Sequence, residues 1–191
     1  MSISHSVTKS TILSLLIILS VANPTTSYRP TYFGRSAASV KIFDSILNRI
    51  CAKTEDPSFC LDAFKHDRGT GRADEAGLCA ITVRLATFVA SNAQSQAVSF
   101  GRSERDAGLK AKYESCVANY DVVLGKLDEA GKSSATASGK YDEVKGKAGE
   151  ANGEAAKCAA AFGGETVVGE YSRQAETLAQ AVGVIAGRLI G

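Results

Sequence analysis

Five cysteines constrain this chain more than any other feature of its sequence. Cys51 and Cys60 bracket a short turn, whereas Cys116 and Cys158 lie far apart, each on the apolar face of a predicted helix. The chain also opens with a predicted export signal, so its cysteines are expected to meet an oxidising environment. We therefore expect two disulfides, Cys51–Cys60 and Cys116–Cys158, with Cys79 left as a free thiol.

The N-terminus has the features of a secretory signal peptide. An apolar run from Ile12 to Ala22 follows a weakly basic start, and its length of about eleven residues suits a signal core but is too short to cross a bilayer. Small residues precede a cleavage site after Ala22, and cleavage as late as Ser27 is an alternative. We expect a secreted protein with a signal peptide over residues 1–22, an irregular arm over 23–38 and one domain over 39–191.

Acidic and basic residues are nearly balanced along the chain. Lysine and arginine together number 22, aspartate and glutamate 20, and the two signs are interspersed. A nucleic-acid partner is not expected, because phosphate backbones are bound by clustered cations. After the signal, no apolar run has membrane-spanning length, and Arg188 interrupts the C-terminal stretch from Leu178 to Gly191, so we expect no membrane partner either.

Two short helices are predicted directly after the arm. From Ser39, apolar residues line one helical face, and this pattern ends at Cys51. Pro57 suits the first turn of a second helix, which carries Cys60. A disulfide between the two cysteines would hold these helices as an antiparallel hairpin.

Four longer helices are predicted over the rest of the chain. Asp74 suits the N-cap position of the first. Its apolar seam is predicted to run through Leu78, Ile81, Leu85 and Phe88 and then through Val89, Ala93, Ala97 and Phe100, before a polar break at 101–108. The other three have regular seams, which are Leu109, Tyr113, Cys116, Tyr120, Val123, Leu127 and Ala130; Tyr141, Val144, Ala148, Ala151, Ala155, Cys158 and Phe162; and Val168, Tyr171, Ala175, Leu178, Val182, Ile185 and Leu189.

Narrow seams joined by short polar loops are typical of antiparallel helix bundles. The predicted fold is all-α: a four-helix up-and-down bundle, preceded by an N-terminal helical hairpin and stapled by two disulfides. Cys116 lies about eighteen residues before Ser134 of the connecting loop and Cys158 about twenty-four after it, so at about 1.5 Å rise per residue the two are level to within about two turns. Cys79 lies one step off its seam; it is either a buried free thiol or the site of an intermolecular disulfide.

The usual catalytic and metal-binding constellations are missing from the sequence. Apart from His5 in the signal, His66 is the only histidine, which does not suffice for a zinc site or a catalytic triad. No bundle helix carries the Glu-x-x-His of di-iron proteins, and Gly69-Thr70-Gly71 lacks the strand and the Gly-Lys-Ser/Thr of a phosphate loop. We expect a protein that is not an enzyme and that holds no cofactor or metal.

Three glycines, Gly146, Gly149 and Gly153, lie within the third bundle helix, beside its apolar seam. Each weakens the helix by about 0.5–1 kcal/mol relative to alanine. Two interpretations are open. The glycines either let a neighbouring helix pack closely or form an exposed strip, poor in side chains, on which a partner docks.

Several segments resemble the plant invertase and pectin methylesterase inhibitor family. Ile50-Cys51-Ala-Lys-Thr-Glu-Asp-Pro57-Ser-Phe59-Cys60 is similar to the opening of that family, and Asp67-Arg68 with Ala73-Asp74-Glu-Ala-Gly77-Leu78 and Leu85-Ala86 is similar to the start of its bundle. A helix with Tyr113, Cys116 and Tyr120, followed by Tyr141 and Cys158-Ala-Ala-Ala-Phe162, completes the resemblance. It covers residues 39–191.

The resemblance implies a protein of the plant apoplast, with the same two disulfides, that inhibits an enzyme by docking a helical face over the active-site cleft. Invertase inhibitors of this family tend to carry Pro-Lys-Phe at the start of the third bundle helix, where this chain has Gly139-Lys140-Tyr141. The lost proline favours pectin methylesterase as the target. Acid invertase of the cell wall or vacuole is the alternative, and allergen-like relatives leave open a binding bundle with no enzyme target.

We expect a monomer whose enzyme partner docks on the outer face of the second and third bundle helices. Small side chains there let a partner approach the backbone, while flanking charges set the register. The residues predicted for this surface are Asp121, Lys126, Lys140, Tyr141, Glu143, Gly146, Lys147, Gly149 and Gly153. Lys140 and Tyr141 are the predicted anchors if invertase is the target. A small-ligand carrier is less favoured, because the regular seams leave no obvious cavity.

Overall fold

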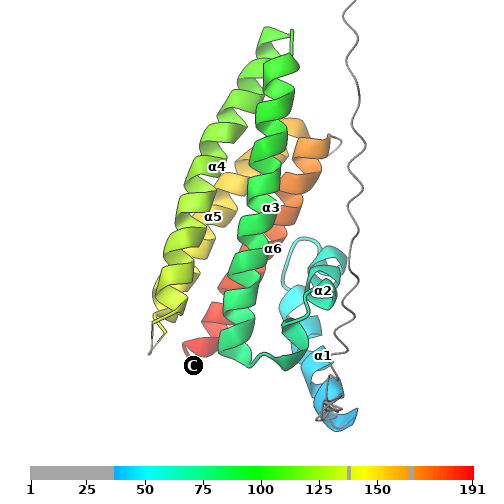
Figure 1. Ribbon diagram of the computed structural model, residues 1–191, viewed down its shortest axis with the longest axis vertical. Coiled ribbons are helices and arrows are strands. Elements are labelled where there is room, and N and C mark those ends of the chain that lie inside the picture. Colours follow the sequence, from blue (N-terminus) through cyan, green and yellow to red (C-terminus); the bar gives the residue numbers. More distant parts are fainter. Residues whose placement is uncertain (1–36, 137–138, 164–165) are drawn as a thin grey trace, which may run out of the picture. The chain divides into compact units, whose positions relative to one another are not determined.

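The computed structural model describes residues 37–136, 139–163 and 166–191, with side chains from Asp44 onward. These residues form α-helices and one 3₁₀ helix, without a strand among them, and so confirm the predicted all-α class (Figure 1). The predicted signal peptide and nearly all of the predicted arm lie outside the described residues. The helices are α1 (Ala37–Cys51), α2 (Pro57–His66), η1 (Thr70–Arg72), α3 (Glu75–Ser103), α4 (Ala107–Ser134), α5 (Tyr141–Phe162) and α6 (Val167–Leu189).

Short polar side chains fix where most of the helices begin. α2, α3, α4 and α6 each follow a residue whose side-chain oxygen accepts a hydrogen bond, at 2.7–3.0 Å, from the backbone N–H three residues on. These N-caps are Asp56, Asp74, Asp106 and Thr166. Each such cap stabilises a helix by about 1 kcal/mol. The cap predicted at Asp74 is confirmed.

The four long helices pack side by side as a bundle (Figure 1). Each contacts chiefly two neighbours, in the order α3, α4, α5, α6 and back to α3. Short connections make successive helices antiparallel. The predicted seams provide nearly all of the buried residues of α4 and α5 and five of the eleven buried residues of α6. The four-helix up-and-down bundle is confirmed.

The first bundle helix, α3, buries only half of the predicted seam, namely Leu78, Val89, Ala93 and Ala97. Ile81 and Leu85 are only half-buried and Phe88 is 65% exposed. The buried face also carries small side chains that were not predicted, such as the fully enclosed Ala86 and Ala90. A core of fixed packing density pairs large side chains with small ones. The large residues come from the other helices, such as the fully buried Tyr120 of α4, and α3 supplies the alanines.

The polar break predicted at residues 101–108 is also shorter in the structure. α3 continues to Ser103, and Gly101 is a point of close packing within it, where a Cβ would stand 3.1 Å from the Cβ of Tyr113. The connection is reduced to residues 104–106. There the carboxylate of Glu104 accepts hydrogen bonds from the N–H groups of Arg105 and Asp106, at 2.7 and 2.9 Å.

Length and apolar composition alone would allow α3 to cross a membrane, and within the described ranges it is the one helix of which this is true. The sequence predicts no span after the signal. A core helix of a soluble bundle has the same composition, and α3 packs along both α4 and α6. Its apolar character is therefore explained by the core that it helps to form.

The two predicted disulfides are both formed in the structure. Cys51–Cys60 closes the hairpin of α1 and α2, and Cys116–Cys158 links α4 to α5, with Cα atoms 5.5 and 5.2 Å apart. Cys79 is free and fully buried, and burial raises the pKa of its thiol to about 11. A buried, neutral thiol is inert. The structure thus supports the interpretation of Cys79 as a small core residue over that of an intermolecular bridge.

The hairpin is tied to the bundle at α6. The backbone N–H of Glu55, in the turn between α1 and α2, donates to Oε1 of Gln180 at 2.7 Å. One turn earlier on α6, Glu176 accepts a hydrogen bond from Nε2 of Gln180 at 3.5 Å. Burial and, to a smaller extent, the charge of Glu55 raise the pKa of the Glu176 carboxyl. The contacts between the hairpin and α6 therefore favour the protonated form of the Glu176 carboxyl more than water does.

We expect Glu176→Gln to stabilise the protein at neutral pH and to flatten its stability profile in mild acid. Because the folded-state pKa of Glu176 is raised, the stability linked to its proton is fully present below the unfolded pKa and is lost as pH rises through the folded pKa. Urea unfolding at about pH 4 and about pH 7 measures this change. Glu114→Gln on α4 is the control, and an equal gain at both pH values would contradict the expectation.

Candidate functional site

Four charged residues join α4 to α5 on the outside of the bundle. Lys126 pairs with Glu150 at 2.8 Å, and Lys147 pairs with Glu129 at 2.8 Å. Weaker pairs within each helix, Lys126–Glu129 at 3.7 Å and Lys147–Glu150 at 3.6 Å, close the set. We call these four residues the α4/α5 charge cluster. Two of them, Lys126 and Lys147, were predicted for the docking surface.

The ion pairs favour the ionised forms of the two glutamates in the α4/α5 charge cluster. The hydrogen bond from Lys147 lowers the pKa of Glu129, and the hydrogen bond from Lys126 lowers the pKa of Glu150. The bond to Glu129 in turn raises the pKa of Lys147. Such exposed pairs add little to stability. They form a fixed pattern of alternating charge on the surface of α4 and α5.

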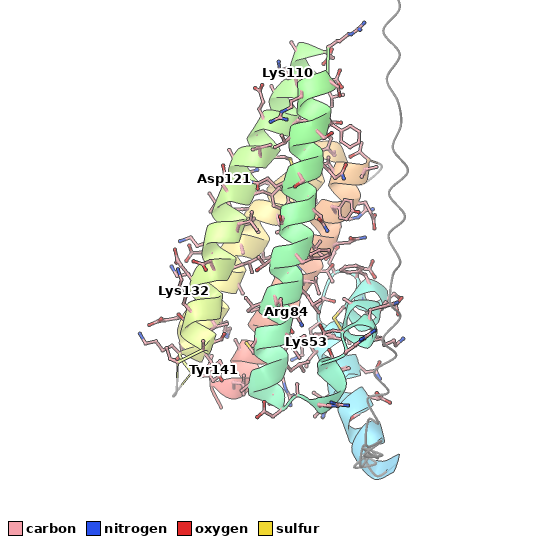
Figure 2. The ribbon with its side chains drawn as sticks, viewed as in Figure 1. Lys53, Arg84, Lys110, Asp121, Lys132 and Tyr141 are labelled. Carbon is pink, nitrogen blue, oxygen red and sulfur yellow. A yellow bond between two sulfur atoms is a disulfide. The ribbon has the colours of Figure 1, made fainter. Side chains whose placement is uncertain are left out.

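The start of α5 is held by the end of α4. Lys140 pairs with Glu143 at 3.2 Å, and Glu143 also accepts a hydrogen bond from the hydroxyl of Ser133 at 3.0 Å. Tyr141 is half-buried against the core, at the end of the bundle where α5 begins (Figure 2). Gly139 has a φ of +54°, and a Cβ there would meet the Tyr141 ring. These contacts keep the predicted pair Lys140 and Tyr141 in place.

Asp121 lies apart from the other predicted residues. Its carboxylate accepts a hydrogen bond from Nε2 of Gln94 on α3 at 2.7 Å, whereas Lys126 pairs with α5. Figure 2 shows Asp121 on α4 between Lys110 and Lys132. Five residues along a helix rotate a side chain by about 140°, which explains the separation from Lys126. The structure does not bring Asp121 together with the rest of the predicted surface.

The three glycines of α5 are exposed to solvent. Within the described part of the chain, a Cβ added at Gly146, Gly149 or Gly153 would meet no atom within 4 Å. No helix packs against them, so the interpretation as close helix packing is wrong. The glycines form a bare strip next to the α4/α5 charge cluster, and Gly149 also borders a groove between α5 and α6.

This groove was missed by reasoning from the sequence. Gly149 lines it from α5, and Gly183 and Gly187 line it from α6. We call it the α5/α6 groove; its volume is about 540 Å³. Gly183 and Gly187 lie one turn apart and off the apolar seam of α6. This spacing was the one feature of the sequence that could have indicated a groove along α6.

The described residues hold no group of three His, Cys, Asp or Glu side chains placed to bind a metal ion. His66 is at the end of α2 and is exposed to solvent. Its Nδ1 lies 2.7 Å from the carbonyl oxygen of Asp62, one turn earlier.

Two known proteins are similar to this chain in sequence. A pectinesterase inhibitor from Actinidia deliciosa is 29% identical over 163 residues, which are 85% of this chain and 82% of the relative. Pectinesterase inhibitor 2 from Arabidopsis thaliana is 30% identical over 99 residues, 52% of this chain and 57% of the relative.

Solved structures are similar as well. The crystal structure of mutant form A of a pectin methylesterase inhibitor from Arabidopsis has a TM-score of 0.65 at 26% identity, covering 74% of this chain and 95% of that one. A pectin methylesterase inhibitor from Arabidopsis thaliana gives 0.57 at 26% identity, covering 76% and 96%. The family model of plant invertase/pectin methylesterase inhibitors matches residues 45–185. The chain therefore belongs to the plant invertase/pectin methylesterase inhibitor family, which consists of inhibitors and not of catalysts.

Proposed function

We propose that this protein is a secreted inhibitor of pectin methylesterase that acts in the plant cell wall. The observation that carries the proposal is the similarity to the pectinesterase inhibitor of Actinidia deliciosa over most of both chains. The two disulfides suit an oxidising, extracellular compartment. We infer a signal peptide over residues 1–22 and an inhibitor domain over 39–191 from the sequence pattern.

The docking surface in this proposal is the outer face of α4 and α5. A stable protein interface buries about 800 Å² per partner around a few central contacts. The exposed strip of Gly146, Gly149 and Gly153 gives a partner access to the α5 backbone. The α4/α5 charge cluster beside it is already paired internally, so its role is to fix orientation more than to add affinity.

The start of α5 supports pectin methylesterase over invertase as the target. The Pro-Lys-Phe segment of invertase inhibitors corresponds here to Gly139-Lys140-Tyr141. The ammonium group of Lys140 is engaged by Glu143, and Tyr141 is half-buried against the core. An anchor residue has to leave such contacts before it can enter another protein, which weakens this segment as an invertase anchor.

Titration of the purified mature protein against both enzymes tests the proposal. In mildly acidic buffer we expect stoichiometric loss of pectin methylesterase activity and no change in acid invertase activity. Reduced and alkylated protein is the control, because it lacks the disulfides that hold the fold. Inhibition of invertase alone would show that acid invertase is the target. Inhibition of neither enzyme would indicate a binding bundle without an enzyme target.

A further inference from the structure

Positive charge gathers around the α5/α6 groove. Lys53 from the turn after α1, Lys145 from α5 and Arg188 from α6 all line it, and no acidic residue is among its lining side chains. Two other grooves on the bundle each include a carboxylate, from Glu114 or Asp128. The whole chain has a net charge of only +2, so this concentration of cations is local.

Two of the three cations are available to a ligand. Arg188 pairs with Glu75 of α3. Lys53 and Lys145 form no ion pair with any residue in the described ranges. Cations that line a concave surface without a carboxylate attract anions and raise their local concentration. The groove is therefore suited to an anionic ligand.

The floor of the groove is shaped for a ligand larger than a simple ion. Gly149 and Gly183 lie on its two sides, and a Cβ at either position would meet no described atom within 4 Å. A ligand can therefore approach both helix backbones. The volume of about 540 Å³ falls within the range of about 300–1,000 Å³ that is usual for small-molecule sites. It far exceeds the space of one inorganic anion.

An amide in the groove also lacks a partner. Oδ1 of Asn152 is buried and accepts no hydrogen bond from the residues that the structure describes. This oxygen has almost no accessible surface, so it is the remainder of the Asn152 amide that lines the groove. The neighbouring Oε1 of Gln180 is already used by the N–H of Glu55. Asn152 therefore adds a polar amide to the positively charged lining of the groove.

We propose that the α5/α6 groove binds a polysaccharide that carries carboxylates. Lys53 and Lys145 face the carboxylates, and the amide of Asn152 that lines the groove faces a sugar hydroxyl. Lysine ammonium groups act as point charges without a fixed bidentate geometry, so they can meet carboxylates that are spaced along a polymer. De-esterified pectin has this chemistry, because hydrolysis of its methyl esters leaves carboxylates on a hydroxyl-rich chain. An acidic peptide supplies carboxylates without a hydroxyl on every unit. The inference goes beyond the proposed function and does not depend on it.

Binding of the intact, purified protein to polygalacturonate, measured by calorimetry without any enzyme, tests this inference. We expect binding that is at least about tenfold weaker for fully methyl-esterified pectin and for poly-L-glutamate. Lys145→Glu should weaken polygalacturonate binding at least about tenfold, because it places a like charge in the groove. Lys112→Glu is the matched control: this exposed lysine on α4 lies outside the groove, and the charge change is the same. Circular dichroism verifies the fold of each variant.

Three results would overturn the inference. Equal binding of esterified and de-esterified pectin would show that the carboxylates are not recognised. Equal binding of poly-L-glutamate would assign the groove to acidic peptides. An equal loss of polygalacturonate binding with Lys112→Glu would show that the effect comes from the net charge of the protein and not from the groove. The polygalacturonate measurement contains no enzyme, so the failure of this inference and that of the proposed function are distinguishable.

Discussion

Replacing Cys116 and Cys158 by alanine is expected to lower the free energy of unfolding by about 4 kcal/mol. The disulfide closes a loop with a sequence separation of 42 residues. Its loss raises the conformational entropy of the unfolded chain and so favours unfolding. It also releases α5, the bundle helix that the exposed glycines weaken by about 0.5–1 kcal/mol each relative to alanine. Urea unfolding, followed by circular dichroism, measures the change.

The hairpin disulfide provides the comparison. Cys51 and Cys60 have a sequence separation of only 9. The same chain-entropy argument gives a loss of about 2.7 kcal/mol when both are replaced by alanine. The order of the two losses is the test. If the hairpin variant loses as much stability as the bundle variant or more, loop entropy does not control the contribution of these disulfides.

The regular parts of the fold could be predicted from the sequence. The seams of α4, α5 and α6 repeat in steps of three and four, so the buried faces of α4 and α5 and part of that of α6 followed from spacing, while the short loops gave the helix directions. The pairing of Cys116 with Cys158 then followed from the helical rise. In α3 the same method succeeded only in part, because it favours large apolar residues. Several buried residues of this helix are alanines, and Phe88 is 65% exposed.

The candidate surface was only partly predictable, for a related reason. Spacing along one helix placed Lys147 beside Gly146, and the structure agrees. Spacing cannot tell which neighbour a side chain meets, and Asp121 was grouped with Lys126 although it bonds to α3. The α5/α6 groove combines residues from the hairpin turn, α5 and α6, so no single stretch of sequence contains its pattern.

The docking surface can be tested by adding bulk to the glycine strip. Gly146 is the best position, because it lies next to Lys147 in the α4/α5 charge cluster and does not line the α5/α6 groove. A Cβ there meets no described atom within 4 Å, so tryptophan fits without moving the bundle. Glycine is also among the poorest helix formers, so helix stability should not fall.

We expect Gly146→Trp to weaken inhibition of pectin methylesterase at least about a hundredfold, since a large ring at the centre of an interface prevents close approach and central contacts are each worth several kcal/mol. Dose–response curves measure the shift, with circular dichroism to verify the fold. Ser95→Trp is the control, because it adds the same ring on the exposed face of α3, which does not neighbour α5 in the bundle. Undiminished inhibition by a folded Gly146→Trp protein would exclude the α4/α5 face as the docking surface. The hairpin of α1 and α2, rigid through its own disulfide, would then be the surface to examine.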